Sequence, residues 1–196
     1  MAEKKLFLLD GHALVYRAHY AFITRPLVNS KGQTTSAISG FVRTLLELMQ
    51  NQKPTHLGVS FDTSKPTFRH IEFEAYKANR DSQPEDISFA IPWIVKILKA
   101  MRIPIVTLDG WEADDVIGTL AKKAETQGYT TYMVTPDKDY AQLVSPNIFL
   151  YKPGKSGGDA EIWGEKEVCE RWNIKRVDQV IDILGLQGDA DRKSVV

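Results

Sequence analysis

The apolar residues of this chain fall into short continuous runs that are separated by longer amphipathic segments. Five runs of five or six residues have the length and composition of buried strands. They cover residues 5–9, 56–61, 103–108, 130–135 and 147–151. Between them, apolar residues recur at helical spacing after Ser36, over 87–98 and over 112–126. A last helical region, 164–187, is expected to divide into two helices near Asn173.

Strands that alternate with helices predict crossover connections, and crossover connections predict a mostly parallel sheet. We therefore expect an α/β fold in which a twisted, mostly parallel central sheet carries helices on both faces. The Gly-rich segment 153–158 interrupts the pattern and is expected to be a mobile hairpin or loop.

Composition narrows the possible functions. Lys and Arg together number 25, as do Asp and Glu, so the net charge is zero and any contact with nucleic acid needs a local basic patch. The single cysteine, Cys169, excludes a disulfide framework within the chain and any Cys-rich zinc site. No apolar run approaches the roughly 18 residues that span a membrane, so we expect a cytoplasmic protein without a membrane partner.

Acidic residues follow the predicted strands. Asp10 follows the first run, Asp62 the second, Asp109 and Glu112 the third, and Asp137 with Asp139 the fourth. The carboxyl ends of parallel strands lie along one edge of a sheet, so these side chains are expected to converge on one site. For a single acid, capping of the following helix is an equally ordinary role.

A cluster of carboxylates without His or Cys suits a hard cation such as Mg²⁺ or Mn²⁺. Glu112 and Asp115 share a helix face, and Asp114 joins them only if Glu112 precedes the first helical turn. Asp189, after Gly188, supplies a further acid. So many carboxylates suggest two cations, which can clamp the attacking and leaving oxygens of a phosphodiester displacement.

A local basic patch lies between positions 65 and 80. It contains Arg69, Lys77 and Arg80, interleaved with aromatic residues that include Tyr76. Cationic groups can hold phosphates and an aromatic face can stack an unpaired base. The alternative is a solvated helix face whose aromatic side chains turn toward the core.

In combination and order, seven motifs resemble the 5′-3′ exonuclease domain of bacterial DNA polymerase I. They are Leu8–His12 with Tyr16–Arg17, Phe61–Asp62, Phe68–His70, Tyr76–Arg80, Glu112–Asp115, Thr135–Asp139 and Gly188–Asp189. The resemblance implies a PIN-like fold with a helical arch. It also implies a two-metal phosphodiesterase that acts on 5′ flaps, nicks and RNA primers on DNA in replication and repair.

The resemblance also implies roles for single residues. The first of two divalent cations, Mg²⁺ or Mn²⁺, would be held by Asp10, Asp62, Glu112 and Asp114. The second would be held by Asp137, Asp139 and Asp189, with Asp115 nearby. DNA would be bound by Arg17, Arg69, Tyr76, Lys77 and Arg80, of which Lys77 and Arg80 would also act on the scissile phosphate.

The resemblance ends at Asp189, because Arg192 stands where the family has its next acid. We expect a nuclease domain over 1–189 and a truncated or cloning-derived tail over 190–196, with weakened duplex binding and cleavage. We expect a monomer, and in longer family members a polymerase domain follows. Two alternatives stay open: a non-catalytic module that binds branched DNA, and a nucleotide-binding α/β protein. The absence of a glycine-rich phosphate loop counts against the nucleotide-binding protein.

Overall fold

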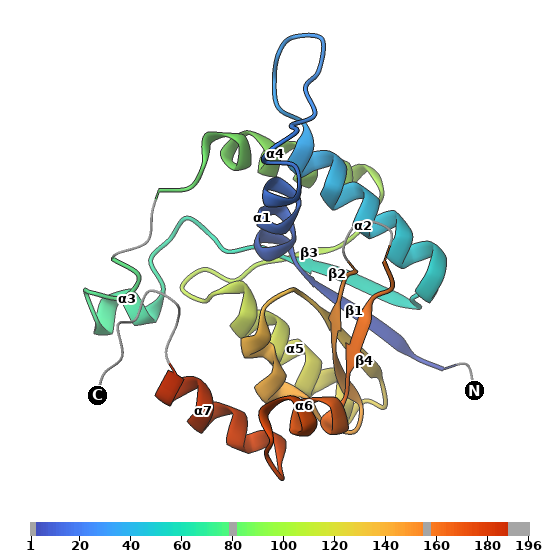
Figure 1. Ribbon diagram of the computed structural model, residues 1–196, viewed down its shortest axis with the longest axis vertical. Helices are drawn as coiled ribbons and strands as arrows, with labels where there is room; N and C mark the ends of the chain where they lie inside the picture. Colours follow the sequence, from blue (N-terminus) through green and yellow to red (C-terminus); the bar gives the residue numbers. More distant parts are fainter. Residues whose placement is uncertain (1–2, 79–81, 155–157, 188–196) are drawn as a thin grey trace.

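The computed structural model describes residues 3–78, 82–154 and 158–187 (Figure 1). It contains one six-stranded sheet in the order β3-β2-β1-β4-β5-β6. All neighbouring pairs are parallel except β5 with β6. The strands are β1 (Lys5–Asp10), β2 (His56–Ser60), β3 (Ile105–Val106), β4 (Thr130–Val134), β5 (Ile148–Lys152) and β6 (Glu161–Trp163). The predicted mostly parallel sheet is confirmed.

The helices cover both faces of the sheet, as predicted (Figure 1). One face carries α1 (Gly11–Ala21), α2 (Ser36–Gln52) and α4 (Glu85–Ala100). The other carries α5 (Ala113–Thr126), α6 (Glu165–Trp172) and α7 (Val180–Gln187). A short helix, α3 (Phe68–Glu72), and two 3₁₀ helices, η1 (Lys138–Leu143) and η2 (Val177–Gln179), complete the described elements.

The central strand β1 builds both halves of the core. Phe7 and Leu9 are fully buried against α1, α2 and α4, whereas Leu8 faces the opposite side and packs with the cluster that contains Met133 and Ile117. A strand covered on both faces reads as a continuous apolar run, which explains why β1 was predictable. The acidic residue at its end, Asp10, is therefore fixed by a rigid strand.

The predicted third strand, 103–108, is wrong in extent because only Ile105 and Val106 pair with β2. The N–H of Ile103 donates instead to Leu98 at the end of α4, and Pro104 has no N–H to donate. The predicted division near Asn173 is confirmed, since Asn173 ends α6 in the left-handed conformation with φ 52°.

Helix α1 was not predicted, because Asp10 and Gly11 resemble a turn in sequence. Asp10 caps this helix, and its carboxylate accepts a hydrogen bond from the Ala13 N–H at 3.0 Å. A Cβ at Gly11 would lie 2.5 Å from the Phe61 ring, so the close approach of α1 to the end of β2 requires glycine. This packing brings the start of α1 next to Asp62.

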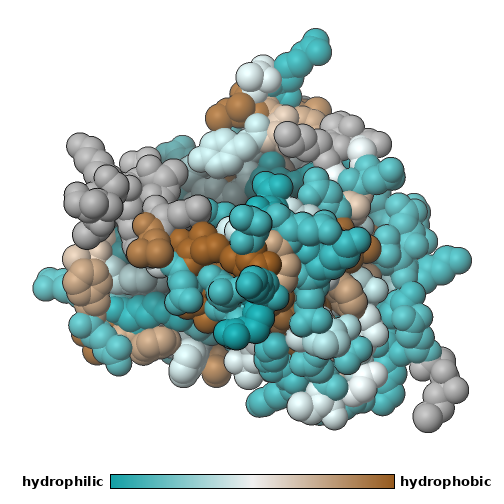
Figure 2. Space-filling model, turned by 60° about the horizontal axis from the view of Figure 1, so that its bottom comes forward, coloured by the Kyte–Doolittle hydropathy of each residue, from teal (hydrophilic) through white to brown (hydrophobic). Residues whose placement is uncertain are grey.

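The lower side of the molecule, which carries α6 and α7, is mostly hydrophilic with one apolar stripe (Figure 2). On α7, Leu186 and Ile181 expose large apolar side chains. Within the described residues, no helix combines the length and apolar character needed to cross a membrane.

Candidate active site

Carboxylates gather where the strands of the sheet end. Asp10 is the last residue of β1, Asp62 lies just beyond β2, Glu112 immediately precedes α5, and Asp137 precedes η1 after β4. Asp62 accepts a hydrogen bond from the Ala113 N–H at 2.7 Å, which ties the end of β2 to the start of α5. The structure thus brings the acidic residues of four separate segments to one edge of the sheet.

Asp10 is buried and is surrounded by neutral hydrogen-bond donors. One carboxylate oxygen accepts from the hydroxyls of Tyr140 at 3.1 Å and Thr135 at 3.3 Å. Burial raises the pKa of Asp10 from 3.8 to about 6, and the negative charges of Asp62 and Asp137 add to the rise. Among the described residues, no basic side chain forms an ion pair with Asp10. This carboxyl group therefore takes up a proton as the pH falls through about 6.

Glu112, Asp114 and Asp115 form the tightest acidic cluster among the described residues. One oxygen from each lies within 4.8 Å of the others. Helix α5 begins at Ala113, so Glu112 precedes the first turn and Asp114 can join the cluster. The Glu112 N–H donates to Asp115 at 3.2 Å, which fixes the two side chains relative to each other. The pKa of Asp114 is raised by desolvation and then by the negative charges of Asp115 and Glu112.

Three residues of the predicted basic patch contact this cluster directly. Arg69 donates two hydrogen bonds to Asp115 at 2.7 and 2.8 Å, a bidentate pair. Lys77 Nζ lies 2.6 Å from one oxygen of Glu112, and the Tyr76 hydroxyl donates to the other at 3.0 Å. The hydrogen bonds from Arg69 lower the pKa of Asp115. A purely solvated helix face does not describe these three side chains.

The backbone around α3 holds these basic groups in place. The Phe68 N–H donates to the Gly110 carbonyl at 3.1 Å, and the Phe68 ring packs against Trp111 at 4.9 Å between centroids. Arg69 stacks over the same Phe68 ring at 4.6 Å. Lys77 adopts a left-handed conformation with φ 57°, which is unfavourable for a residue with a side chain. Strain at this position accompanies its short contact with Glu112.

The remaining predicted site residues lie in different surroundings. Asp137 is exposed and accepts a hydrogen bond from the Asp139 N–H at 2.9 Å. Arg17 does not reach the acidic cluster, because its guanidinium donates to the carbonyls of Pro153, at 3.1 Å, and Gly154. Burial lowers the pKa of Arg17. Arg80, Asp189 and the tail 190–196 lie outside the described residues.

Sequence reasoning missed three residues that contact the acids. Tyr140 and Thr135 hold Asp10, and burial followed by the charge of Asp10 raises the pKa of Tyr140. His12 accepts a hydrogen bond from the Asp62 N–H at 3.1 Å, and burial lowers the pKa of His12. Tyr140 follows Asp139 directly and Thr135 precedes the same acidic segment, so their position beside predicted site residues could have identified them in the sequence.

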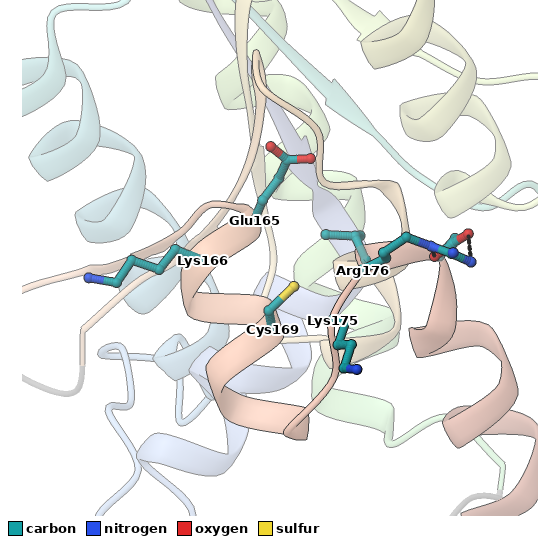
Figure 3. A pocket seen from close by; sticks show the side chains of 7 residues that line it. Glu165, Lys166, Cys169, Lys175 and Arg176 are labelled. Carbon is teal, nitrogen blue, oxygen red and sulfur yellow. Dashed lines mark hydrogen bonds and ion pairs between the residues drawn. The ribbon is translucent and has the colours of Figure 1, made fainter.

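Two hollows mark the surface. A groove of about 580 Å³ begins at Arg69, Asp114 and Asp115 and continues between α5 and η1. A second hollow, of about 530 Å³, lies between α6 and η2 and is separate from the acidic residues of the site (Figure 3). There Cys169 faces the segment with Lys175 and Arg176, and Arg176 pairs with Asp178 at 3.0 Å.

The chain belongs to the family described as 5′-3′ exonuclease, N-terminal resolvase-like domain, which matches residues 5–173. It is 39% identical over 188 residues to DNA polymerase I of Bacillus caldotenax and 40% identical over 189 residues to that of Bacillus subtilis. These matches cover 95% and 96% of this chain but 21% of each polymerase. The chain therefore spans about a fifth of the length of these relatives.

Solved structures show the same fold at lower sequence identity. The T5 D15 protein, co-crystallised with metal ions, has a TM-score of 0.68 and 21% identity, and the match covers 94% of this chain and 67% of that protein. The catalytic core of Rad2 in complex with DNA has a TM-score of 0.58 and 18% identity, covering 95% of this chain and 55% of Rad2. Together with the sheet described above, these similarities confirm the predicted 5′-nuclease fold.

Proposed function

We propose that this chain is the nuclease part of a divalent-metal-dependent 5′-3′ exonuclease and flap endonuclease. Its substrates would be DNA with a 5′ flap or nick and RNA primers on DNA. The observation that carries the proposal is the acidic edge of the sheet, where Arg69, Tyr76 and Lys77 lie directly over Glu112 and Asp115. Phosphodiester hydrolysis needs both groups: carboxylates for cations, and cationic groups for phosphate.

The donor set fits a hard divalent cation. All candidate ligands are carboxylate oxygens, and those of Glu112, Asp114 and Asp115 lie within 4.8 Å of one another. We propose that Asp10, Asp62, Glu112 and Asp114 hold one Mg²⁺ or Mn²⁺, and that Asp137, Asp139 and Asp189 hold a second. Such cations supply charge neutralisation and activation of water in phosphoryl transfer. A T5 D15 flap endonuclease of the same fold was crystallised with DNA and metal ions, which supports this assignment.

The basic residues have a second role once cations occupy the acids. A cation bound at Glu112 would take over the neutralising role of the Lys77 ammonium, so that Lys77 can pair with a phosphate. Arg69, which stays paired with Asp115, has further N–H groups that can contact the same phosphate. Tyr76, half-buried beside them, can donate its hydroxyl to a phosphate oxygen or stack on a base. Arg17 and Arg80 are proposed to extend this phosphate-binding surface.

The test is cleavage of a DNA duplex with a fluorescently labelled 5′ flap, in Mg²⁺ or Mn²⁺ and in EDTA. We expect cleavage with either cation and none in EDTA. Asp10→Ala should lower the rate on the order of 10³-fold, because loss of a bound cation removes several kcal/mol of charge stabilisation. The matched control is Asp178→Ala, which removes an exposed acid that is paired with Arg176 and is not one of the proposed ligands. Binding of the flap without cleavage in either cation would favour the non-catalytic module instead.

A further inference from the structure

The groove beside the acidic cluster has two ends of opposite charge. Asp114 and Asp139 line it near the cluster, and Lys122 and Lys123 line it further along α5. Gly118 lies between the two ends on the same helix. A Cβ at Gly118 would meet the Leu143 side chain at 3.0 Å, so glycine lets η1 pack close to α5 and form the wall of the groove.

Lys122 and Lys123 are exposed. Within the part of the chain that the structure describes, neither ammonium group has a carboxylate partner within 4 Å. Lys123 lies in the last turn of α5, where a positive charge also stabilises the helix through its dipole. The helix dipole does not explain why two adjacent lysines line a groove that leads to Asp114.

The spacing of the two ends matches a nucleic-acid backbone. Lys122 lies eight residues after Asp114, which is about 12 Å along an α-helix. Successive phosphates in one strand of B-form DNA are separated by an axial rise of about 3.4 Å and also by the turn of the double helix, so a distance of about 12 Å reaches fewer phosphates than the rise alone implies. A strand whose scissile phosphate lies at Asp114 would therefore present its second or third neighbouring phosphate to Lys122 and Lys123.

We propose that this groove is a backbone-binding subsite, in which Lys122 and Lys123 together hold the phosphate two or three positions from the scissile bond. The proposal rests on the proposed nuclease function and adds positioning residues to it. By holding a phosphate at this distance, the two lysines would orient the scissile phosphate against the carboxylates without contacting it themselves.

Binding of a 5′-flap duplex, measured by fluorescence anisotropy in EDTA over a range of salt concentrations, tests the subsite. The double variant Lys122→Gln/Lys123→Gln should lower the slope of log Kd against log salt concentration by about 0.9, because it removes one phosphate contact. Lys99→Gln is the matched control, since Lys99 also lies exposed in the last turn of a helix, α4, on the opposite face of the sheet. A slope for the double lysine variant equal to that of Lys99→Gln would contradict the proposed subsite.

Single methylphosphonate substitutions, which remove the charge of one phosphate, locate the contact. At the second or third phosphate from the scissile bond, the substitution should abolish the difference in Kd between the parent and the double lysine variant. An unchanged difference at both positions, or no binding by the parent, would overturn the proposal. Because this assay measures binding alone, failure of the nuclease function appears separately, as binding without cleavage in Mn²⁺.

Discussion

The two halves of the carboxylate site differ in how they tolerate negative charge. Asp10 lies among hydroxyl groups, and burial raises its pKa to about 6. Asp115 lies against Arg69, whose hydrogen bonds lower the pKa of that carboxyl. A cation bound at Asp10 would therefore replace a proton when the pH is below about 6. Beside Asp115, a cation bound at Glu112 would instead replace the Lys77 ammonium.

The two carboxyl groups differ because they lie in different parts of the fold. Asp10 ends a central strand that is covered on both faces, and its hydrogen bonds within the described residues come from one main-chain N–H and two hydroxyl groups. Glu112 is buried and Asp115 is half-buried at the start of α5, where the segment of Arg69 and Lys77 folds over them. A buried acid without a cation partner takes up a proton, while a paired acid stays ionised.

The largest effect on stability is expected from a substitution of Asp10. In the metal-free protein, Asp10→Asn should raise the free energy of unfolding by about 3 kcal/mol at pH 8, since each pKa unit corresponds to about 1.36 kcal/mol. The folded pKa is raised from 3.8 to about 6, so the cost of ionising Asp10 accumulates as pH rises between these values. The gain should therefore vanish below about pH 4. Urea unfolding in EDTA at both pH values measures it, with Asp178→Asn as a control; a variant less stable than the parent at pH 8 would contradict this account.

A change in the second half should have the opposite sign. Arg69→Ala should lower the free energy of unfolding by about 2 kcal/mol at pH 7, because it leaves the partly buried Asp115 without its charged donor. Arg69→Lys should lower the free energy of unfolding by a smaller amount, because an ammonium group keeps the positive charge but cannot form the bidentate pair. Chemical unfolding of both variants in EDTA checks the order, and equal stability of Arg69→Ala and the parent would show that the pair does not support the fold.

The smallest expected effect concerns competition between Lys77 and a cation for Glu112. Lys77→Met should tighten Mn²⁺ binding about fivefold, equivalent to about 1 kcal/mol for a partly exposed ion pair. Lys65→Met is the matched control, because Lys65 forms an exposed pair with Asp109 at 2.6 Å outside the cluster. Calorimetric titration gives both constants, and weaker Mn²⁺ binding in Lys77→Met would show that Lys77 assists the cation instead.

Much of the fold was predictable because the strands β1, β2, β4 and β5 are buried apolar runs. Helix α1 was missed, although Leu14, Val15 and Ala18 form its buried face. The edge strand β6 was missed because it has three residues, two of which are exposed. Short edge strands and a helix that starts directly at a strand leave little periodic signal.

The site was predictable only where strand order fixes position. Asp10 and Asp62 follow from the ends of strands, and Glu112 from the start of the helix after the third strand, so the order of the elements predicts their convergence. The contacts of Arg69, Tyr76 and Lys77 depend on the turns around α3 and on a left-handed Lys77, which a sequence pattern does not specify. The position of Arg17 against Pro153 and Gly154 depends on a long-range contact of the same kind.

The number of protons released on Mn²⁺ binding shows whether Asp10 exchanges a proton for the cation. Calorimetric titrations in two buffers of different ionisation enthalpy give the number of protons released at pH 5.5 and at pH 7.5. Because the pKa of Asp10 is about 6, we predict binding at both pH values, with most of one proton released from Asp10 at pH 5.5 and little at pH 7.5. Absence of Mn²⁺ binding, or proton release that is the same at both pH values, would contradict the account.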